Sequence, residues 1–365
     1  MTPYNLITTV VLLLPINQGT LESDWFKLTQ KPYANAKIAE LGQLPLLEKS
    51  DTKELWEIKK KDLFKLWIKE LGVFPQKPES LKIKFESTEK MEDHCRTLIS
   101  FESDKSDRMR AFLLTTNGLK ENEKRPAIIV FHQTTKDTIK EPVGLGPNPN
   151  LALALHLVKR GYMVLAPECF IMKEKGPQAQ AIALPIDHPN LTGMGKMVYD
   201  AIRCVDLLES LENINPLKIG CIGFSLGAKE VLFSMAFETR LKVGVFNEGG
   251  IGLRMSNYTD PWYLTSKMKK NIPQMENHQV MALIAPRPLL IMGGNSADGD
   301  ASWPFVYATL PVYKLYSADD KIGLINHLGK HSFPYEARKT AYRWLDHWLE
   351  HKPTSDEAGP IQIKE

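Results

Sequence analysis

From residue 126 onward, short apolar runs alternate with segments of helical periodicity. The apolar runs lie at 127–131, 162–166, 218–224, 241–246 and 288–293, with a weaker run at 322–326. Helical patterns lie at 150–160, 195–211, 226–237 and 337–349. Continuous apolar runs are typical of strands that are buried on both faces. Strands that alternate with helices predict an α/β fold, with a mostly parallel, doubly wound sheet and helices on both faces.

The part before this alternation has a different pattern. A helical pattern covers 54–71, so residues 20–80 are predicted to form an N-terminal helical extension, and 81–352 the main domain. Strand-like segments at 94–102 and 108–115 flank a polar turn, which predicts an antiparallel hairpin. Residues 353–365 are expected to form a flexible tail.

An apolar run near the N-terminus bears on localisation. Residues 6–16 are too few to span a bilayer, and they resemble the core of a secretion signal. However, Met1 to Asn5 contains no Lys or Arg, and no A-x-A site follows. We treat residues 1–19 as a signal-like segment and slightly favour a secreted or periplasmic protein over a cytoplasmic one. The alternative is a segment that packs on the domain. No later run predicts an integral membrane span.

Composition narrows the range of partners. The chain carries 46 basic and 43 acidic residues, a net charge of +3, and the charges are interspersed. This balance argues against nucleic-acid binding. The four cysteines show no CxxC and no metal-type spacing, so no metal site is predicted.

The sequence GFSLG at 223–227 contains the strongest chemical motif. It has the form G-x-S-x-G and lies between the apolar run KIGCIG and the helical pattern LGAKEVLFSMAF. A serine on a sharp strand-to-helix turn is exposed at the carboxyl end of the sheet, and the glycines allow the turn to be tight. A helix N-cap would explain Ser225 but not both glycines. The motif therefore predicts that Ser225 is a nucleophile.

A serine nucleophile needs a base and an acid. His331, in GKHSFP between the last strand and the last helix, is the predicted base, because the order Ser…acid…His is typical of such sites. His327 is the nearest rival, but it directly follows the strand. For the acid we favour Asp298 in the loop GGNSADGD, with Glu248 in FNEGGIG as the main alternative and Asp300 as a third.

An oxyanion hole requires two N–H groups. The backbone N–H of Leu226, directly after the nucleophile, is expected to supply one. The second is expected from Gln133 or Thr134, in the loop after the strand AIIVF, where His132 is expected to shape the loop.

These motifs resemble the α/β-hydrolase superfamily, in its dienelactone-hydrolase-like and acetyl-xylan-esterase-like branch. The resemblance covers 126–349 and rests on these stretches: FHQTTKD, RGYMVLAPE, IGCIGFSLGAKE, FNEGGIG, ALIAPRPLLIMGG and GKHSFP. The chain is more distantly similar to glucuronoyl esterases. The resemblance implies an α/β-hydrolase fold and a serine esterase that works through an acyl-enzyme. It implies a small-molecule or carbohydrate ester as substrate, and no cofactor.

The chain also departs from these relatives. Dienelactone hydrolases use a cysteine nucleophile, where this chain has Ser225. Glucuronoyl esterases carry an arginine directly after the serine, where this chain has Leu226. Lys229 follows Ser225 by four residues, as their lysine does, and Glu248 and Asp298 match their two acid positions. A peptidase of the prolyl-oligopeptidase type and a catalytically silent binding protein are the alternatives.

Two irregular segments follow strands whose carboxyl ends should face the nucleophile. Residues 168–192 read as a loop, and 251–279 contain Trp262, Tyr263 and several methionines. These segments are expected either to cover the site as a lid or substrate wall, or to pack on the core.

Overall fold

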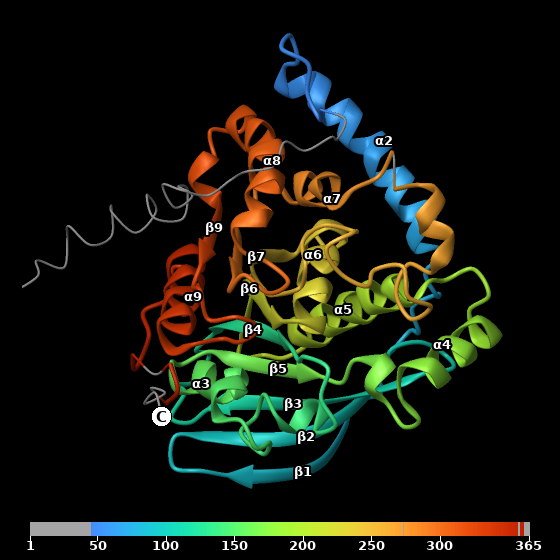
Figure 1. Ribbon diagram of the computed structural model, residues 1–365. Helices are drawn as coiled ribbons and strands as arrows, with labels where there is room; N and C mark the ends of the chain where they lie inside the picture. Colours follow the sequence, from blue (N-terminus) through green and yellow to red (C-terminus); the bar gives the residue numbers. More distant parts are fainter. Residues whose placement is uncertain (1–44, 273, 357, 361–365) are drawn as a thin grey trace, which may run out of the picture.

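The computed structural model describes residues 45–272, 274–356 and 358–360. These residues form one nine-stranded sheet with the order β1-β2-β3-β5-β4-β6-β7-β8-β9 (Figure 1). The strands are β1 (Lys84–Lys90), β2 (His94–Glu102), β3 (Arg108–Thr116), β4 (Arg125–Phe131), β5 (Met163–Pro167), β6 (Ile214–Phe224), β7 (Leu241–Asn247), β8 (Leu289–Gly293) and β9 (Ile322–Asn326). The pairs β1–β2, β2–β3 and β3–β5 are antiparallel. The remaining pairs, from β5–β4 to β8–β9, are parallel. The predicted hairpin is formed by β2 and β3.

Helices cover both faces of the sheet, as predicted (Figure 1). They are α2 (Lys53–Leu71), α3 (Leu153–Lys159), α4 (Gly176–Asp187), α5 (Gly193–Glu209), α6 (Leu226–Phe237), α7 (Asn277–Ile284), α8 (Trp303–Leu315) and α9 (Tyr335–Trp348). The core on one face includes residues of α3 and α9, and the larger core on the other face includes residues of α2, α5, α6, α7 and α8.

Strand β4 shows how one apolar run serves both cores. Ala127, Ile129 and Phe131 belong to the larger core, whereas Ile128 and Val130 belong to the smaller one. Because successive side chains of a strand point to opposite faces, a run without polar residues is needed when both faces are covered. This burial explains why the apolar runs located the central strands.

Helix α2 packs against the main domain. Trp56 and Trp67 on this helix are almost fully buried, and the indole N–H of Trp67 donates a 3.1 Å hydrogen bond to Gln279 Oε1 near the start of α7. Thr52 caps the helix by accepting from the N–H of Leu55. The described part of the predicted N-terminal extension therefore shares its core with the hydrolase-like part.

Two segments differ from the sequence expectations. The 168–192 segment contains helix α4, where a loop was expected. Only Leu184 of α4 is buried, so the helix has little apolar periodicity, and it contains Pro185, a residue that is unusual inside a helix. Strand β1 was not predicted, because all of its residues are exposed and most are polar. In the described part of the 353–365 segment, Ala358 and Pro360 accept hydrogen bonds from Arg338 through their carbonyl oxygens.

The signal-like segment 1–19 lies outside the described residues. Within the ranges that the structure describes, no helix combines the length and the apolar character that crossing a membrane requires.

Candidate active site

Ser225 lies on a tight turn between β6 and α6. Its backbone angles, φ 57° and ψ −112°, fall in a strained region that non-glycine residues rarely adopt. A Cβ on Gly223 would lie 2.2 Å from the carbonyl carbon of Gly227, and one on Gly227 would lie 2.0 Å from the carbonyl oxygen of Phe131. Both glycines of the motif are therefore required by close backbone contact, which a capping serine alone does not explain.

A chain of hydrogen bonds connects three side chains at the carboxyl edge of the sheet. His331 Nε2 lies 3.0 Å from Ser225 Oγ, and His331 Nδ1 lies 3.3 Å from Glu248 Oε2. Glu248 directly follows β7, and His331 lies in the loop between β9 and α9. Ser225 is partly exposed and the side chain of His331 is 44% exposed, so a substrate can reach both.

The carboxylate beside His331 is Glu248, not the favoured candidate Asp298. The two oxygens of Asp298 accept from the backbone N–H groups of Gly250 and Ile251, at 2.6 and 2.7 Å, and from the hydroxyl of Ser302. They are thus directed into the loop that follows β7. The third candidate, Asp300, accepts from the side-chain amide of Asn326.

Glu248 makes the reciprocal contact with the loop that follows β8. Its oxygens accept from the N–H groups of Gly294, Ala297 and Asp298. Burial by itself would raise the pKa of Glu248, but the bond to His331 and these N–H groups outweigh it, so the pKa lies below the usual 4.5. For Asp298, burial wins over its donors and raises the pKa to about 6. Glu248 is therefore well suited to remain ionised beside an imidazole.

The rival histidine, His327, does not face the serine. Its Nε2 lies 3.3 Å from Asn247 Oδ1, and its Nδ1 accepts from the N–H of Gly329. Burial lowers the pKa of His327. These contacts agree with the expectation that His327 has a packing role at the end of β9.

The expected oxyanion loop lies against the turn that carries Ser225. A Cβ on Gly227 would lie 2.0 Å from the carbonyl oxygen of Phe131 and 3.0 Å from that of His132, so the turn packs closely on the start of this loop. His132 is buried; its Nδ1 donates to the carbonyl oxygen of Gln133, and its Nε2 accepts from the N–H of Cys169. The side chain of Gln133 is held by Glu141, whereas Thr134 is exposed. The loop is thus fixed on both sides.

Lys229 lies one helical turn after Ser225, buried between aromatic rings. Its Nζ is 5.4 Å from the ring centre of Tyr258 and 5.5 Å from that of Tyr263, where the negative face of each ring attracts a cation. Burial lowers the pKa of Lys229 to about 8, although Asp298 and Asp260 oppose this shift. The 251–279 segment therefore contributes core packing beside the nucleophile helix.

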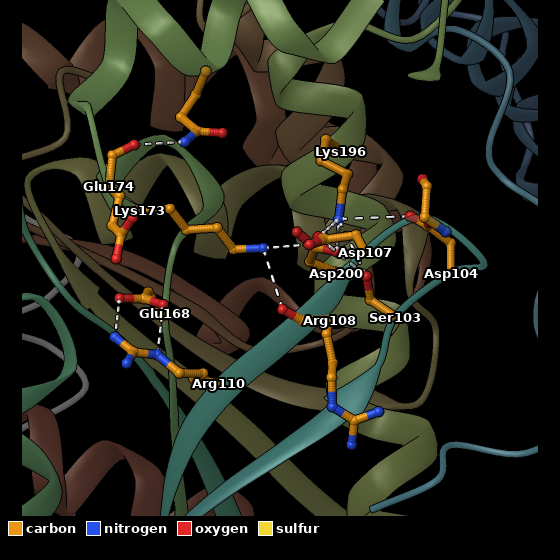
Figure 2. A network of polar contacts seen from close by, with 12 residues as sticks. Ser103, Asp104, Asp107, Arg108, Arg110, Glu168, Lys173, Glu174, Lys196 and Asp200 are labelled. Atoms are coloured by element: carbon orange, nitrogen blue, oxygen red, sulfur yellow. Dashed lines mark hydrogen bonds and ion pairs between the residues drawn. The ribbon is translucent and has the colours of Figure 1, made fainter. Parts of the chain in front are cut away.

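A polar network fixes the segment that carries α4 (Figure 2). Asp107, in the β2–β3 turn, accepts from Lys196 of α5 at 2.8 Å and from Lys173 at 2.5 Å. Burial opposes ionisation of Asp107, but the two ammonium groups hold its pKa well below the usual range. At the other end of α4, His188 Nε2 lies 3.3 Å from Asp104. The ion pair of Lys173 with Asp107 and the contact of His188 with Asp104 thus connect both ends of this segment to one turn.

Sequence reasoning missed Asn247, which lies next to Glu248 and bonds to His327 and Ser332. The signal was present: an asparagine that ends an otherwise apolar strand needs polar partners when it is buried. Within the described ranges, no group of three or more His, Cys, Asp or Glu residues is arranged to hold a metal ion.

A mostly parallel sheet with a serine on the turn after a central strand, and a histidine after the last strand, defines the α/β-hydrolase fold. Residues 109–260 match the dienelactone hydrolase family. This match confirms the resemblance predicted from the motifs.

Similar proteins include YtaP of Bacillus subtilis, 25% identical over 42% of this chain and 54% of YtaP. A 4-O-methyl-glucuronoyl methylesterase of Wolfiporia cocos is 26% identical over 43% of this chain and 46% of its own length. The chain thus spans about half the length of the curated relatives it matches. Among solved structures, a glucuronoyl esterase from Solibacter usitatus superposes with a TM-score of 0.68 at 15% identity, covering 85% of this chain and 98% of that one. This likeness shows the shared fold.

Proposed function

We propose that this protein is a serine hydrolase that cleaves a carboxylic ester through an acyl-enzyme. The observation that carries the proposal is the hydrogen-bonded chain Ser225–His331–Glu248, set on a strained turn at the carboxyl edge of the sheet. The matched family and the esterases among the similar proteins support the same reaction class. A binding protein without catalytic activity would not need the hydrogen-bonded arrangement of Ser225, His331 and Glu248.

In the first step, Ser225 Oγ attacks the ester carbonyl carbon and His331 Nε2 takes the hydroxyl proton. His331 Nε2 must be unprotonated for this transfer, so its proton lies on Nδ1, which donates to Glu248. The ionised Glu248 keeps the imidazole in this tautomer and stabilises the imidazolium that forms. The same imidazolium then protonates the leaving alcohol.

The negative charge that develops on the carbonyl oxygen requires N–H donors. The backbone N–H of Leu226 supplies one, and the N–H of Gln133 or Thr134 supplies the other. After the alcohol leaves, His331 activates a water molecule that attacks the acyl carbon, and the acid and free Ser225 are released. The chemistry needs no cofactor.

The substrate class we propose is a carbohydrate-linked ester. The similar proteins include enzymes named for glucuronoyl esters, and one structural relative is an acetyl xylan esterase by name. Leu226 stands where glucuronoyl esterases carry an arginine, so this chain lacks one feature of the proteins that act on uronic acid esters. We therefore expect an acetyl ester to be cleaved faster than a glucuronate methyl ester.

The test compares wild type, Ser225→Ala and the control Ser210→Ala on four substrates: p-nitrophenyl acetate, p-nitrophenyl butyrate, acetylated xylan and a glucuronate methyl ester. Ser225→Ala should reduce kcat by at least about 10³-fold, whereas Ser210→Ala, at the distant end of α5, should retain wild-type rates. Turnover by folded Ser225→Ala would refute the nucleophile. Cleavage of a peptide but no ester would favour a peptidase.

A further inference from the structure

Asn247 is a fully buried asparagine at the end of β7 whose polar groups all have partners. Its side-chain Nδ2 donates to the carbonyl oxygen of Ser332 at 3.1 Å, and its Oδ1 lies 3.3 Å from His327 Nε2. Its backbone carbonyl oxygen accepts from the N–H of Ser225 at 2.9 Å. One residue thus contacts the nucleophile and both ends of the loop that carries His331.

The direction of each bond follows from the donors. The N–H of Gly329 donates to His327 Nδ1 at 3.1 Å, so the proton of the neutral imidazole lies on Nε2. This Nε2–H can only donate, so the oxygen of Asn247 must face it. The NH₂ group of Asn247 then faces the carbonyl oxygen of Ser332. Burial lowers the pKa of His327, which favours the neutral form that this arrangement needs.

The loop between these two anchors is short and carries the proposed base. His331 directly precedes Ser332, and Lys330, on its other side, adopts a left-handed backbone with φ 59°. The N–H of Lys330 donates to the carbonyl oxygen of Gly294, and the N–H of Gly294 donates to Glu248. A shift of the loop would change the distances from His331 to Ser225 and Glu248 together.

We propose that Asn247, with His327 as its partner, is a positioning residue that sets the reach of His331 toward Ser225. This inference rests on the proposed serine-hydrolase function. Asn247 does not touch the reacting atoms. It acts through its hydrogen bonds to both ends of the 327–332 loop. Its neighbour Glu248 contacts the imidazole of His331 at Nδ1. Positioning errors of about 1 Å are enough to slow catalysis by roughly 100-fold.

The substitution that isolates this role is Asn247→Asp, which keeps the shape and the acceptor for His327. It replaces the NH₂ donor by an oxygen, so two acceptors face each other at Ser332. The control is Asn213→Asp, because Asn213 also donates from Nδ2 to a backbone carbonyl oxygen, that of Glu123, but at the opposite end of β6.

The readout is inactivation by a fluorophosphonate, in which Ser225 Oγ displaces fluoride at phosphorus and His331 takes the hydroxyl proton. This reaction does not require knowledge of the natural substrate. For Asn247→Asp we expect the first-order rate at saturating probe to fall by about 10- to 100-fold, with little change in half-saturating concentration. Asn213→Asp should react as wild type does, and Ser225→Ala should not react.

Variants of His327 keep the inference testable if Asn247→Asp does not fold. Gln places an N–H donor near the position of His Nε2, so His327→Gln should retain most of the wild-type rate. His327→Leu lacks the donor and should be slowed as Asn247→Asp is. Circular dichroism checks that each variant is folded.

The outcomes separate this inference from the function on which it rests. If wild type itself is not labelled at Ser225, the serine-hydrolase proposal fails. If wild type is labelled and folded Asn247→Asp or His327→Leu reacts at the wild-type rate, the positioning role fails alone. The positioning role is also wrong if Asn213→Asp is slowed as much as Asn247→Asp, because the loss would then reflect general destabilisation.

Discussion

The loops that follow β7 and β8 are built alike but serve His331 differently. Each carries a buried carboxylate that accepts backbone N–H groups of the other loop: Glu248 accepts from 294–298, and Asp298 accepts from Gly250 and Ile251. Only Glu248 also reaches His331. Each loop is therefore hydrogen-bonded to the carboxylate of the other loop, and the carboxylate of Glu248 additionally contacts the imidazole of His331.

The two carboxyls differ in how far their hydrogen-bond donors offset the effect of burial on the pKa. Glu248 accepts from three N–H groups and from His331, and its pKa is lowered despite burial. Asp298 accepts from two N–H groups and one hydroxyl, and burial, together with the nearby charge of Glu248, raises its pKa to about 6. Each donor stabilises the charged form by replacing lost water contacts. The loop with more donors thus provides the better partner for a transient imidazolium.

The largest expected effect comes from Glu248→Gln. A glutamine keeps the shape but removes the charge, and its NH₂ group would face an N–H donor of the 294–298 loop or the Nδ1–H of His331. We expect kcat on p-nitrophenyl acetate to fall by about 10³- to 10⁴-fold, with a small change in KM. Wild-type kcat in folded Glu248→Gln would show that Glu248 is not the acid.

A smaller effect is expected for Asp298→Asn. The amide can accept only one of the two N–H groups of Gly250 and Ile251, so one buried donor loses its partner, at a cost of about 1–3 kcal/mol in unfolding free energy. Because His331 keeps its contact with Glu248, kcat should fall by only about 10-fold. The measurement is kcat of Asp298→Asn and of Glu248→Gln by steady-state kinetics on the same substrate. A larger loss for Asp298→Asn would restore the original assignment of Asp298 as the acid.

The sequence predicted the fold well because its apolar runs reflect burial on both faces, as in β4. It also singled out Ser225 and His331, which lie 3.0 Å apart in the structure, because the topology fixes the position of each relative to a strand. It favoured Asp298 over Glu248, whereas Glu248 lies beside His331; both carboxylates follow neighbouring strands at the same edge, so position along the chain does not separate them. That choice depends on side-chain direction, which arises from loop contacts distant in sequence. Helix α4 was missed because it buries little and lacks clear periodicity.

A third buried carboxyl extends the comparison to a site with fewer donors. Glu230, on α6 near Cys169, is almost fully buried, and its Oε1 has no hydrogen-bond partner in the described structure. Burial raises the pKa of Glu230 to about 8, and the thiol of Cys169 only partly opposes this. The three carboxyls thus rank as their donors do: Glu248 lowest, Asp298 intermediate and Glu230 highest.

Of the three carboxyl substitutions, Glu230→Gln is expected to change activity least. It is expected to change how the free energy of unfolding depends on pH. The pKa of Glu230 in the folded protein, about 8, exceeds the ordinary 4.5, so the folded state binds this proton more tightly than the unfolded state. Its contribution to stability is therefore complete below pH 4.5 and is lost as pH rises to 8, at roughly 1.4 kcal/mol per pH unit before compensation by the rest of the protein. Glutamine mimics the protonated acid and does not titrate.

Urea unfolding at pH 5, 7 and 9 measures this difference. At pH 5, Glu230→Gln and wild type should have similar unfolding free energies; at pH 9 the variant should be more stable by a few kcal/mol, while kcat stays within about twofold of wild type. The control Glu121→Gln, at an exposed position, should follow wild type throughout. Parallel losses of stability for wild type and Glu230→Gln would mean that another group titrates, and that the pKa of Glu230 is not raised in the folded protein.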